Sequence, residues 1–287
     1  MKTRNVLWSY FFVAPNLLFL SLFLLYPLIY TIYLSFNDAN LYTSTFVGFD
    51  NYKNIFQSTL FHKSLINTFY YILLIVPAVV IISLIFAAMM QGLHKRAKNI
   101  YRLIFYLPVV STPVVLSLVW SWMYNPSIGI INYLGNAFGM EKIDVFANST
   151  SAILALSVIV VTWMVGQPLI LYMSAIDGIS GELYEAAEID GAGTLRKFFS
   201  ITLPLVSQTT LLIVVTSTIS VFQIFVVVHL ITNGGPFHGT ESLVYTIYQT
   251  AFVSLQFGEA SAQSVILFII IVLIAFIQFK LMRSTSK

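Results

Sequence analysis

The chain has 287 residues, of which 58% are hydrophobic and only 9% are charged, against roughly 25% charged residues in an ordinary soluble domain. This composition excludes a soluble globular protein, because no soluble core could bury so much apolar surface. The net charge of +3 comes from Lys and Arg residues that flank apolar runs, which indicates orientation in a bilayer rather than nucleic-acid binding, and the absence of cysteine excludes disulfides and thiolate metal sites.

Uncharged runs of about 20 residues or more recur along the chain and predict an all-α, polytopic membrane protein, organised as one transmembrane domain over residues 1–287. The first run extends over residues 6–36, which is too long for the core of a signal peptide. We therefore expect a retained first span at about 10–35, with a cleaved signal peptide as the alternative.

A polar and aromatic loop is expected over residues 37–65, before a second span at about 67–91. The segment 92–102 is short and strongly basic. It begins with Gly92, which suits the end of a helix.

The third span is predicted at about 103–124 and contains Pro108 and Pro113. Proline kinks a helix and frees backbone carbonyls, which neighbouring helices or a water-lined cavity must then satisfy. The aromatic residues at the end of this span, Tyr124 among them, either mark the membrane interface or offer faces for ligand stacking.

A polar loop over residues 125–150 leads to a fourth span at about 152–175. The fifth span, at about 205–231, is unusually rich in hydroxyl and amide side chains. A loop over residues 232–262 and a sixth span at about 263–280 complete the predicted order.

The distribution of basic residues predicts the orientation of the six spans. If both chain ends lie on one side, that side also holds the 92–102 turn and the polar segment before the fifth span, and together these regions contain eleven of the fourteen Lys and Arg residues. The positive-inside rule then places both the N-terminus and the C-terminus in the cytoplasm.

The interior of the six spans contains no Asp, Glu, Lys or Arg, which argues against a proton-coupled carrier because ion relays need such groups. The polar side chains of the fifth span either bond neighbouring helices or face a solvated path. In the second case they would hydrogen-bond a neutral, hydroxyl-rich solute, and aromatic side chains would offer flat faces to sugar rings. The candidate path residues are Tyr124, Trp163, Gln167, Ser217, Ser220 and Gln223.

The chain contains no Gly-x-x-x-x-Gly-Lys-Ser/Thr loop, so another subunit would have to bind ATP. The spans also offer no metal-ligand cluster, no pair of acids and no nucleophile with a base, which argues against an enzyme. Uphill transport would therefore need a partner that pushes on this chain.

Residues 180–204 contain four of the eleven acidic residues and must lie in water. We expect Ser180 to cap a helix that Gly191 ends, and Thr194 to cap a second short helix. The result is a helix-turn-helix, longer than an ordinary connection, whose alanine-lined face suits a groove on a partner. A purely structural loop is the alternative.

A motif within this segment resembles that of a known family. The pattern E-A-A-x-x-x-G-x(9)-I-x-L-P is the EAA motif of membrane subunits of binding-protein-dependent ABC importers, and both its identities and its spacing are met. The matching residues are Glu185, Ala186, Ala187, Gly191, Ile201, Leu203 and Pro204.

Further stretches resemble the carbohydrate-uptake branch of that family, akin to the maltose and glycerol-phosphate permeases. They include residues 48–52, residues 107–108 in the third span, residues 182–184 before the motif and residues 232–236 after the fifth span. One departure is Gln208, where many relatives have a proline.

The resemblance implies a permease subunit of an ATP-driven importer, forming half of the path for a sugar or oligosaccharide in a bacterial or archaeal inner or plasma membrane. Its implied partners are a second, non-identical permease subunit, two ATPase subunits that hold ATP and Mg, and an extracytoplasmic solute-binding protein; no cofactor is implied on this chain. The helix carrying Glu185, Ala186, Ala187, Asp190 and Gly191 would be the coupling helix in the ATPase groove. A stand-alone secondary carrier is the alternative.

Overall fold

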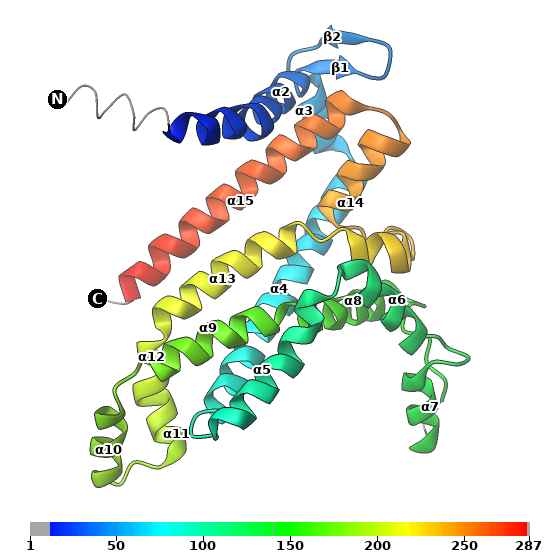
Figure 1. The fold of residues 1–287 in the computed structure, drawn as a ribbon. Coiled ribbons are helices and arrows are strands. Elements are labelled where there is room, and N and C mark those ends of the chain that lie inside the picture. Colours follow the sequence, from blue (N-terminus) through cyan, green and yellow to red (C-terminus); the bar gives the residue numbers. More distant parts are fainter. Residues whose placement is uncertain (1–11, 140, 286–287) are drawn as a thin grey trace, which may run out of the picture. The chain divides into compact units, whose positions relative to one another are not determined.

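The computed structural model describes residues 12–139 and 141–285, and most of these residues are helical (Figure 1). Their contacts group into two units. The first contains the described residues up to Phe61 together with Thr246–Ile270, and the second contains His62–Tyr245 and the described residues from Ile271 onward. The start of the predicted first span and the N-terminal residues used in the charge count lie outside the described residues.

The first unit begins with an apolar helix, Phe12–Leu34, which includes the π-helical turn η1 (Ser21–Leu25) and α2 (Tyr26–Leu34). An antiparallel hairpin of β1 (Asn37–Ala39) and β2 (Ser44–Phe46) follows, and then α3 (Asp50–Gln57). The predicted loop over residues 37–65 is therefore largely structured.

Hydrogen bonds from two asparagine side chains explain why this polar segment folds. The side-chain oxygen of Asn40 accepts the N–H groups of Tyr42 and Thr43, both at 2.9 Å, which closes the hairpin turn. The amide of Asn51 in α3 donates to the carbonyls of Ser35 and Asn37 at 2.9 and 2.8 Å.

The second unit starts along α4 (Thr59–Met89), which is followed by α5 (Lys95–Val110) and α6 (Pro113–Met123). The last two helices are bent by 98°, so the predicted third span at about 103–124, which was expected to be kinked at its prolines, is broken into two helices. The break lies before Pro113, because the residue that precedes a proline is driven out of the helical region. Thr112 is extended and its side chain accepts from the N–H of Val115, which caps α6.

After α7 (Ile130–Ala137), a second bent pair is formed by α8 (Ser149–Met164) and α9 (Gly166–Asp177), at an angle of 47°. The side chain of Asn148 accepts from the N–H of Ser151 at 2.9 Å and caps α8. The predicted fourth span at 152–175 is thus also broken.

The polar segment forms α10 (Gly181–Ile189), α11 (Thr194–Lys197), the π-helical turn η2 (Phe198–Thr202) and α12 (Leu203–Leu205), and it leads into α13 (Ser207–Phe222). The helical stretch Thr194–Leu205 is bent by 67° relative to α13. These elements connect α9 to α13.

Within the predicted fifth span at 205–231, α13 ends at Phe222 and the π-helical turn η3 (Val228–Thr232) is separate from it. The predicted loop over residues 232–262 contains α14 (Leu243–Tyr248) and the π-helical turn η4 (Gln249–Val253). The last helix, α15 (Phe257–Thr285), begins before the predicted start at 263.

Three described helices are long and apolar enough to cross a membrane: Phe12–Leu34, Thr59–Met89 and Phe257–Leu281. Up to six result if each bent pair is one span. The expected class, a mostly helical protein built from apolar helices, is therefore confirmed, while the number of spans and their orientation stay predictions.

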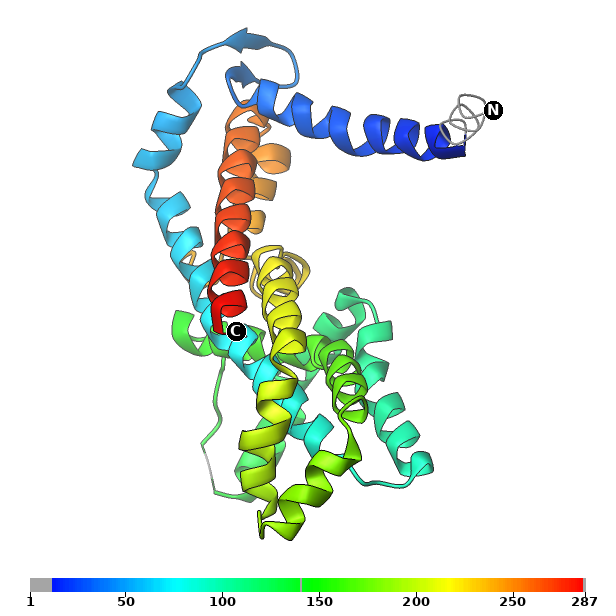
Figure 2. The ribbon, with the colours of Figure 1, turned by 90° about the vertical axis from the view of Figure 1, so that its left-hand side faces the viewer.

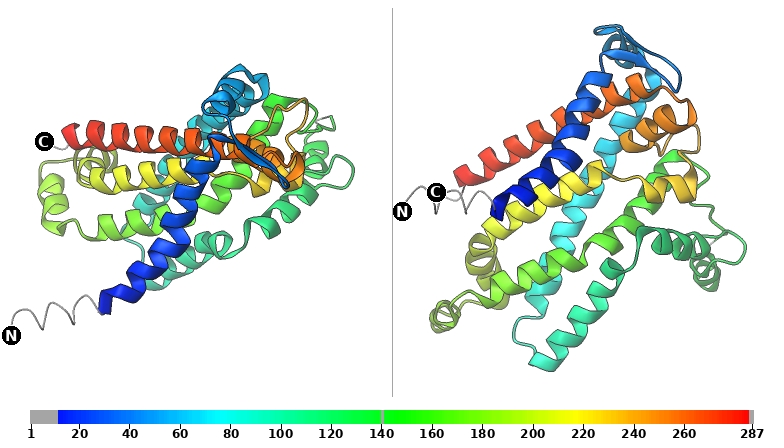
Figure 3. Two further views of the ribbon diagram at one scale, coloured as in Figure 1. Left: turned by 90° about the horizontal axis from the view of Figure 1, so that it is seen from above. Right: turned by 45° about the horizontal axis from the view of Figure 1, so that its top comes forward.

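Two buried clusters hold the second unit together. One surrounds Tyr71, Leu156 and Val228 on α4, α8 and η3. The other surrounds Leu169 and Ile213, where α9 packs against α13. Figure 2 and Figure 3 show α10 and α11 at one end of this unit, beyond α9 and α13.

Candidate functional site

The helix α10 ends in a glycine motif that depends on local backbone geometry. Gly191 has a φ of +76°, a conformation that costs a residue with a Cβ about 1–2 kcal/mol. Its N–H donates to the carbonyl of Glu188 at 2.9 Å, and the N–H of Ala192 donates to the carbonyl of Ala187 at 2.8 Å. This pair of bonds is the Schellman motif, which satisfies the last carbonyls of the helix. The prediction that Gly191 ends the helix is confirmed.

Of the two predicted N-terminal caps, Ser180 stands at the predicted position and Thr194 does not. Ser180 occupies the N-cap position of α10, but its side chain makes no capping hydrogen bond. Thr194 is the first residue of α11, and Gly193 stands at the N-cap. Contacts between the two helices, rather than these caps, hold the segment in shape.

Two side-chain contacts join α10 to the elements after the turn. The Lys197 ammonium donates to Oε1 of Glu188 at 2.6 Å. The hydroxyls of Tyr184 and Thr202 lie 2.9 Å apart, at a point where Thr202 is buried. The hydrogen bond and the charge of Lys197 lower the pKa of the Glu188 carboxyl below its usual value. Two contacts across the turn therefore hold the helix-turn-helix together.

The coupling segment, which we define as α10 to α12, exposes acidic side chains beside apolar ones. Glu185, Ala186 and Asp190 are exposed. Ile189 and Leu195 expose 87% and 75% of their surface, which is costly in water unless a partner covers them. This chemistry fits a protein partner.

The second half of the motif lies apart from α10. Ile201 is partly buried in η2, while Leu203 and Pro204 form the exposed start of α12. These residues direct the chain from the coupling segment into α13.

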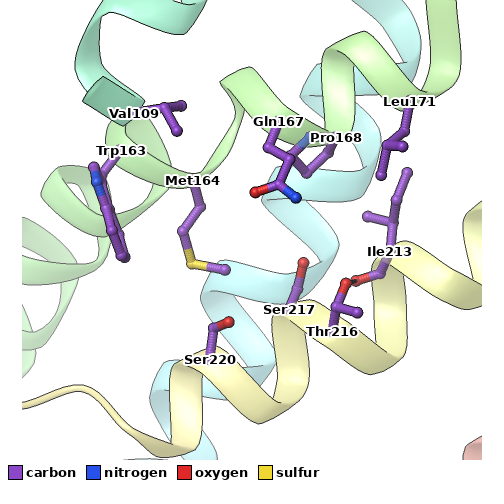
Figure 4. Close-up of a pocket in the computed structure, with 10 residues that line it drawn as sticks. All are labelled: Val109, Trp163, Met164, Gln167, Pro168, Leu171, Ile213, Thr216, Ser217 and Ser220. Atoms are coloured by element: carbon purple, nitrogen blue, oxygen red, sulfur yellow. Dashed lines mark hydrogen bonds between the residues drawn. The ribbon is translucent and has the colours of Figure 1, made fainter. Parts of the chain in front are cut away.

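A cavity of about 210 Å³ lies between α5, α8, α9 and α13 (Figure 4). None of its ten lining residues carries a charge. They are Val109, Trp163, Met164, Gln167, Pro168, Leu171, Ile213, Thr216, Ser217 and Ser220.

Polar groups from opposite walls meet in this cavity. Figure 4 shows the amide of Gln167 and the hydroxyls of Ser217 and Ser220 directed toward the same space. The ring of Trp163 closes one side, and its Nε1 is buried with no hydrogen-bond partner among the described residues. Such a lining offers donors, acceptors and a flat ring face to an uncharged polar ligand.

The structure brings four of the six predicted path residues together: Trp163, Gln167, Ser217 and Ser220. Tyr124 is 7% exposed and packs against Trp120 and Phe146, with its hydroxyl donating to the carbonyl of Ala155. It does not line the cavity.

Gln223 also lies outside the cavity lining, because it follows the end of α13 in an exposed turn. The apolar lining residues were missed, since apolar side chains are common on every span and carry no signal of their own. Thr216 and Ile213 could have been found, because they share one helical face with Ser217 and Ser220 at spacings of three and four residues.

The cavity and the coupling segment are joined through two helices. The helix α9 carries Gln167, Pro168 and Leu171 at its start and leads into α10 after Asp177. The helix α13 carries the other wall and follows α12 directly. Between the two ends, the hydroxyl of Tyr172 on α9 donates to Oγ1 of Thr210 on α13 at 3.0 Å.

Among the described residues, no group of three or more His, Cys, Asp or Glu side chains could hold a metal ion.

Residues 61–284 match the family model described as "Binding-protein-dependent transport system inner membrane component". The chain is 32% identical to the probable ABC transporter permease protein YurN of Bacillus subtilis, over the full length of both chains. It is 33% identical to the diacetylchitobiose uptake system permease protein NgcF of Streptomyces coelicolor, covering 84% of this chain and 72% of that one.

The fold is similar to that of a chain in the crystal structure of a bacterial alginate ABC transporter, in complex with an alginate-pentasaccharide-bound periplasmic protein. The TM-score is 0.88, with 20% identity, and the match covers 100% of this chain and 97% of the other.

Proposed function

The chain belongs to the family of inner membrane components of binding-protein-dependent transport systems and is a permease subunit, and from this premise we propose that it forms half of an ATP-driven import path for an uncharged sugar or oligosaccharide. One observation carries the proposal. The two helices that form opposite walls of the cavity, α9 and α13, are the two that enter and leave the coupling segment. A displacement of α10 therefore has a direct mechanical route to both walls.

The exposed surface of α10 suits the groove of an ATPase subunit. Glu185, Ala186 and Ala187 belong to the motif, and the small alanines allow close approach of a partner. The Schellman motif at Gly191 and the bond between Glu188 and Lys197 keep the segment stiff, so that a push is transmitted rather than absorbed. ATP and Mg would be held by that partner, and this chain carries no catalytic step.

The cavity favours a neutral solute. Its polar groups are an amide and hydroxyls, and no Lys or Arg lines it to pair with a phosphate or a uronate. One relative is named as part of an uptake system for diacetylchitobiose, and diacetylchitobiose is a neutral disaccharide. Trp163 offers the flat apolar surface on which one face of a sugar ring can lie.

The proposed assembly contains a second, non-identical permease subunit, two ATPase subunits and an extracytoplasmic solute-binding protein in a bacterial or archaeal inner membrane. The proposed six spans with both ends in the cytoplasm rest on the positive-inside rule, and they would put Lys95, Lys98, Arg102 and Lys197 on the side of the ATPases. A secondary carrier is not favoured, because the family depends on a binding protein.

The test is solute uptake into proteoliposomes that contain this chain, the second permease subunit and the ATPase. The binding protein is added on the side of the membrane opposite the ATPase. The panel is diacetylchitobiose, maltose, glycerol 3-phosphate and an alginate oligosaccharide. We expect ATP-dependent uptake of one of the two neutral sugars. Uptake by this chain alone on an ion gradient would refute the importer, and uptake of only the anions would refute the substrate class.

A further inference from the structure

Two helices of the second unit, α5 and α9, pack along their lengths in opposite directions. The contacting residues of α5 recur at intervals of three or four positions, the spacing of a single helical face. On α5 these are Lys98, Arg102, Phe105 and Val109. On α9 the contact runs from Gly166 to Asp177.

At the cavity end, the two backbones are in direct contact. A Cβ added at Gly166 would collide with the carbonyl oxygen of Phe105 and would lie 2.6 Å from Cγ2 of Val109. Glycine is therefore required by the close approach. Val109 and the start of α9 both line the cavity.

At the other end, a single carboxylate joins the two helices. Oδ1 of Asp177 lies 2.8 Å from Nζ of Lys98, and Oδ2 lies 3.5 Å from a terminal guanidinium nitrogen of Arg102. Lys98 and Arg102 are one helical turn apart on α5, so both oxygens of the carboxylate are used. The Lys98 side chain is only 20% exposed, so water screens this contact less than it would a fully exposed pair.

Asp177 has a particular place in the chain. It is the last residue of α9, and α10 begins four residues later at Gly181. On the side of α9, a force on the coupling segment therefore reaches Asp177, which is bonded to α5, before the rest of that helix.

We propose that Asp177 is a positioning residue that makes α5 and α9 move as one rigid body, so that displacement of α10 carries the α5 wall of the cavity together with the α9 wall. The proposal rests on the proposed function, because it assumes that α10 receives the push. Without the bond, α9 would tilt while the basic end of α5 stayed behind. The cavity would then change shape incompletely, and ATP hydrolysis would be spent without solute movement.

The first test compares Asp177→Asn with Asp177→Glu in the complete importer in proteoliposomes. We expect Asp177→Asn to lower the solute moved per ATP hydrolysed at least threefold while ATP hydrolysis itself persists. Asp177→Glu retains the charge and should restore most of the coupling. The matched control is Lys95→Gln, which removes a cation from the same basic segment but breaks no ion pair of the described residues. Unchanged coupling in Asp177→Asn would overturn the proposal.

The second test uses the absence of cysteine from the chain. The double variant Lys98→Cys, Asp177→Cys removes the ion pairs, and a short bifunctional thiol reagent can replace them by a covalent link. We expect low coupling before the reaction and recovered coupling after it, because two parts of one rigid body tolerate a link. Uptake that is abolished by the link would show that α5 and α9 move apart, and the proposal would be wrong.

The results distinguish failure of the proposed function from failure of the role of Asp177. If the unmodified complex shows no ATP-dependent uptake of any solute in the panel, the proposed function fails. If the unmodified complex transports and Asp177→Asn is equally coupled, only the role of Asp177 fails.

Discussion

The coupling segment and the cavity are built in opposite ways. The coupling segment is one continuous stretch whose shape depends on residues a few positions apart, such as the bonds of Gly191 and Ala192 to the preceding turn. The cavity is assembled from four helices, and its lining extends from Val109 to Ser220. An element held by local bonds keeps its shape when it binds a partner, whereas the shape of the cavity changes whenever the helices move. A rigid coupling segment can transmit movement, and a deformable cavity can open and close.

The two regions should therefore respond differently to substitution. Changes in the coupling segment should affect every solute equally, because they act on the partner that supplies the energy. Changes in the cavity should be graded and should depend on the solute.

The largest effect is expected for Gly191→Pro. Proline cannot adopt the φ of +76° found there, and it removes the N–H that donates to Glu188. We expect uptake of every solute to be abolished and the ATPase to dissociate on a sizing column, while the protein still inserts in the membrane. The control is Gly193→Ala, since Gly193 has a φ of −69° and open space for a Cβ. A fully active Gly191→Pro variant would remove the distinction between the two regions.

The next effect is expected for Glu185→Lys. Glu185 is exposed and forms no ion pair among the described residues, so reversing its charge should leave the free energy of unfolding nearly unchanged. We expect at least a tenfold loss of ATPase association, measured by co-purification. The control is Glu182→Lys in the first turn of the same helix. Equal losses in both variants would indicate a general effect of charge rather than a docking contact.

A smaller, solute-dependent effect is expected in the cavity. Removing a ring that stacks on a sugar costs about 1 kcal/mol, or roughly a fivefold rise in KM. We expect Trp163→Leu to raise KM by this amount for the transported sugar, without change in ATPase association. The control is Gln223→Leu, at a polar position outside the cavity lining. An equal change in both variants would mean that the cavity does not contact the solute.

The smallest effect concerns pH and tests the stiffness of the coupling segment. The pKa of Glu188 is lowered in the folded protein by Lys197, so its contribution to stability is present above the unfolded pKa and is lost as the pH falls through the folded pKa. A spin label at Ser200→Cys should therefore become more mobile only in acid. In a Glu188→Gln background the mobility should not depend on pH over the same range, and a persistent dependence would assign it to another group.

The sequence predicted much of the coupling segment because its signals are local. Four acidic residues in an apolar chain require water, and a glycine that ends a helix acts through bonds to the preceding turn. For a related reason, Thr194 was mispredicted as a cap, and Ser180 stands at the N-cap without a capping hydrogen bond. A serine or threonine can cap, but whether it does so depends on the orientation of the chain before it.

The cavity was predicted less completely. Polar side chains in apolar spans identified Trp163, Gln167, Ser217 and Ser220, because such groups are conspicuous there. Tyr124 has the same chemistry but is held in a buried aromatic cluster, and only packing could exclude it.

By itself, the sequence determined the class of the protein, its apolar helices, its EAA motif and the geometry at Gly191, because each depends on composition or on neighbours within a few residues. Only the tertiary structure decided the angles of the bends before Pro113 and at Gly166, the membership of the cavity and the bond of Asp177 to Lys98 and Arg102. Residues 79 positions apart meet in that bond. Their meeting depends on how closely α5 and α9 can approach, which is a property of packed helices and not of either helix alone.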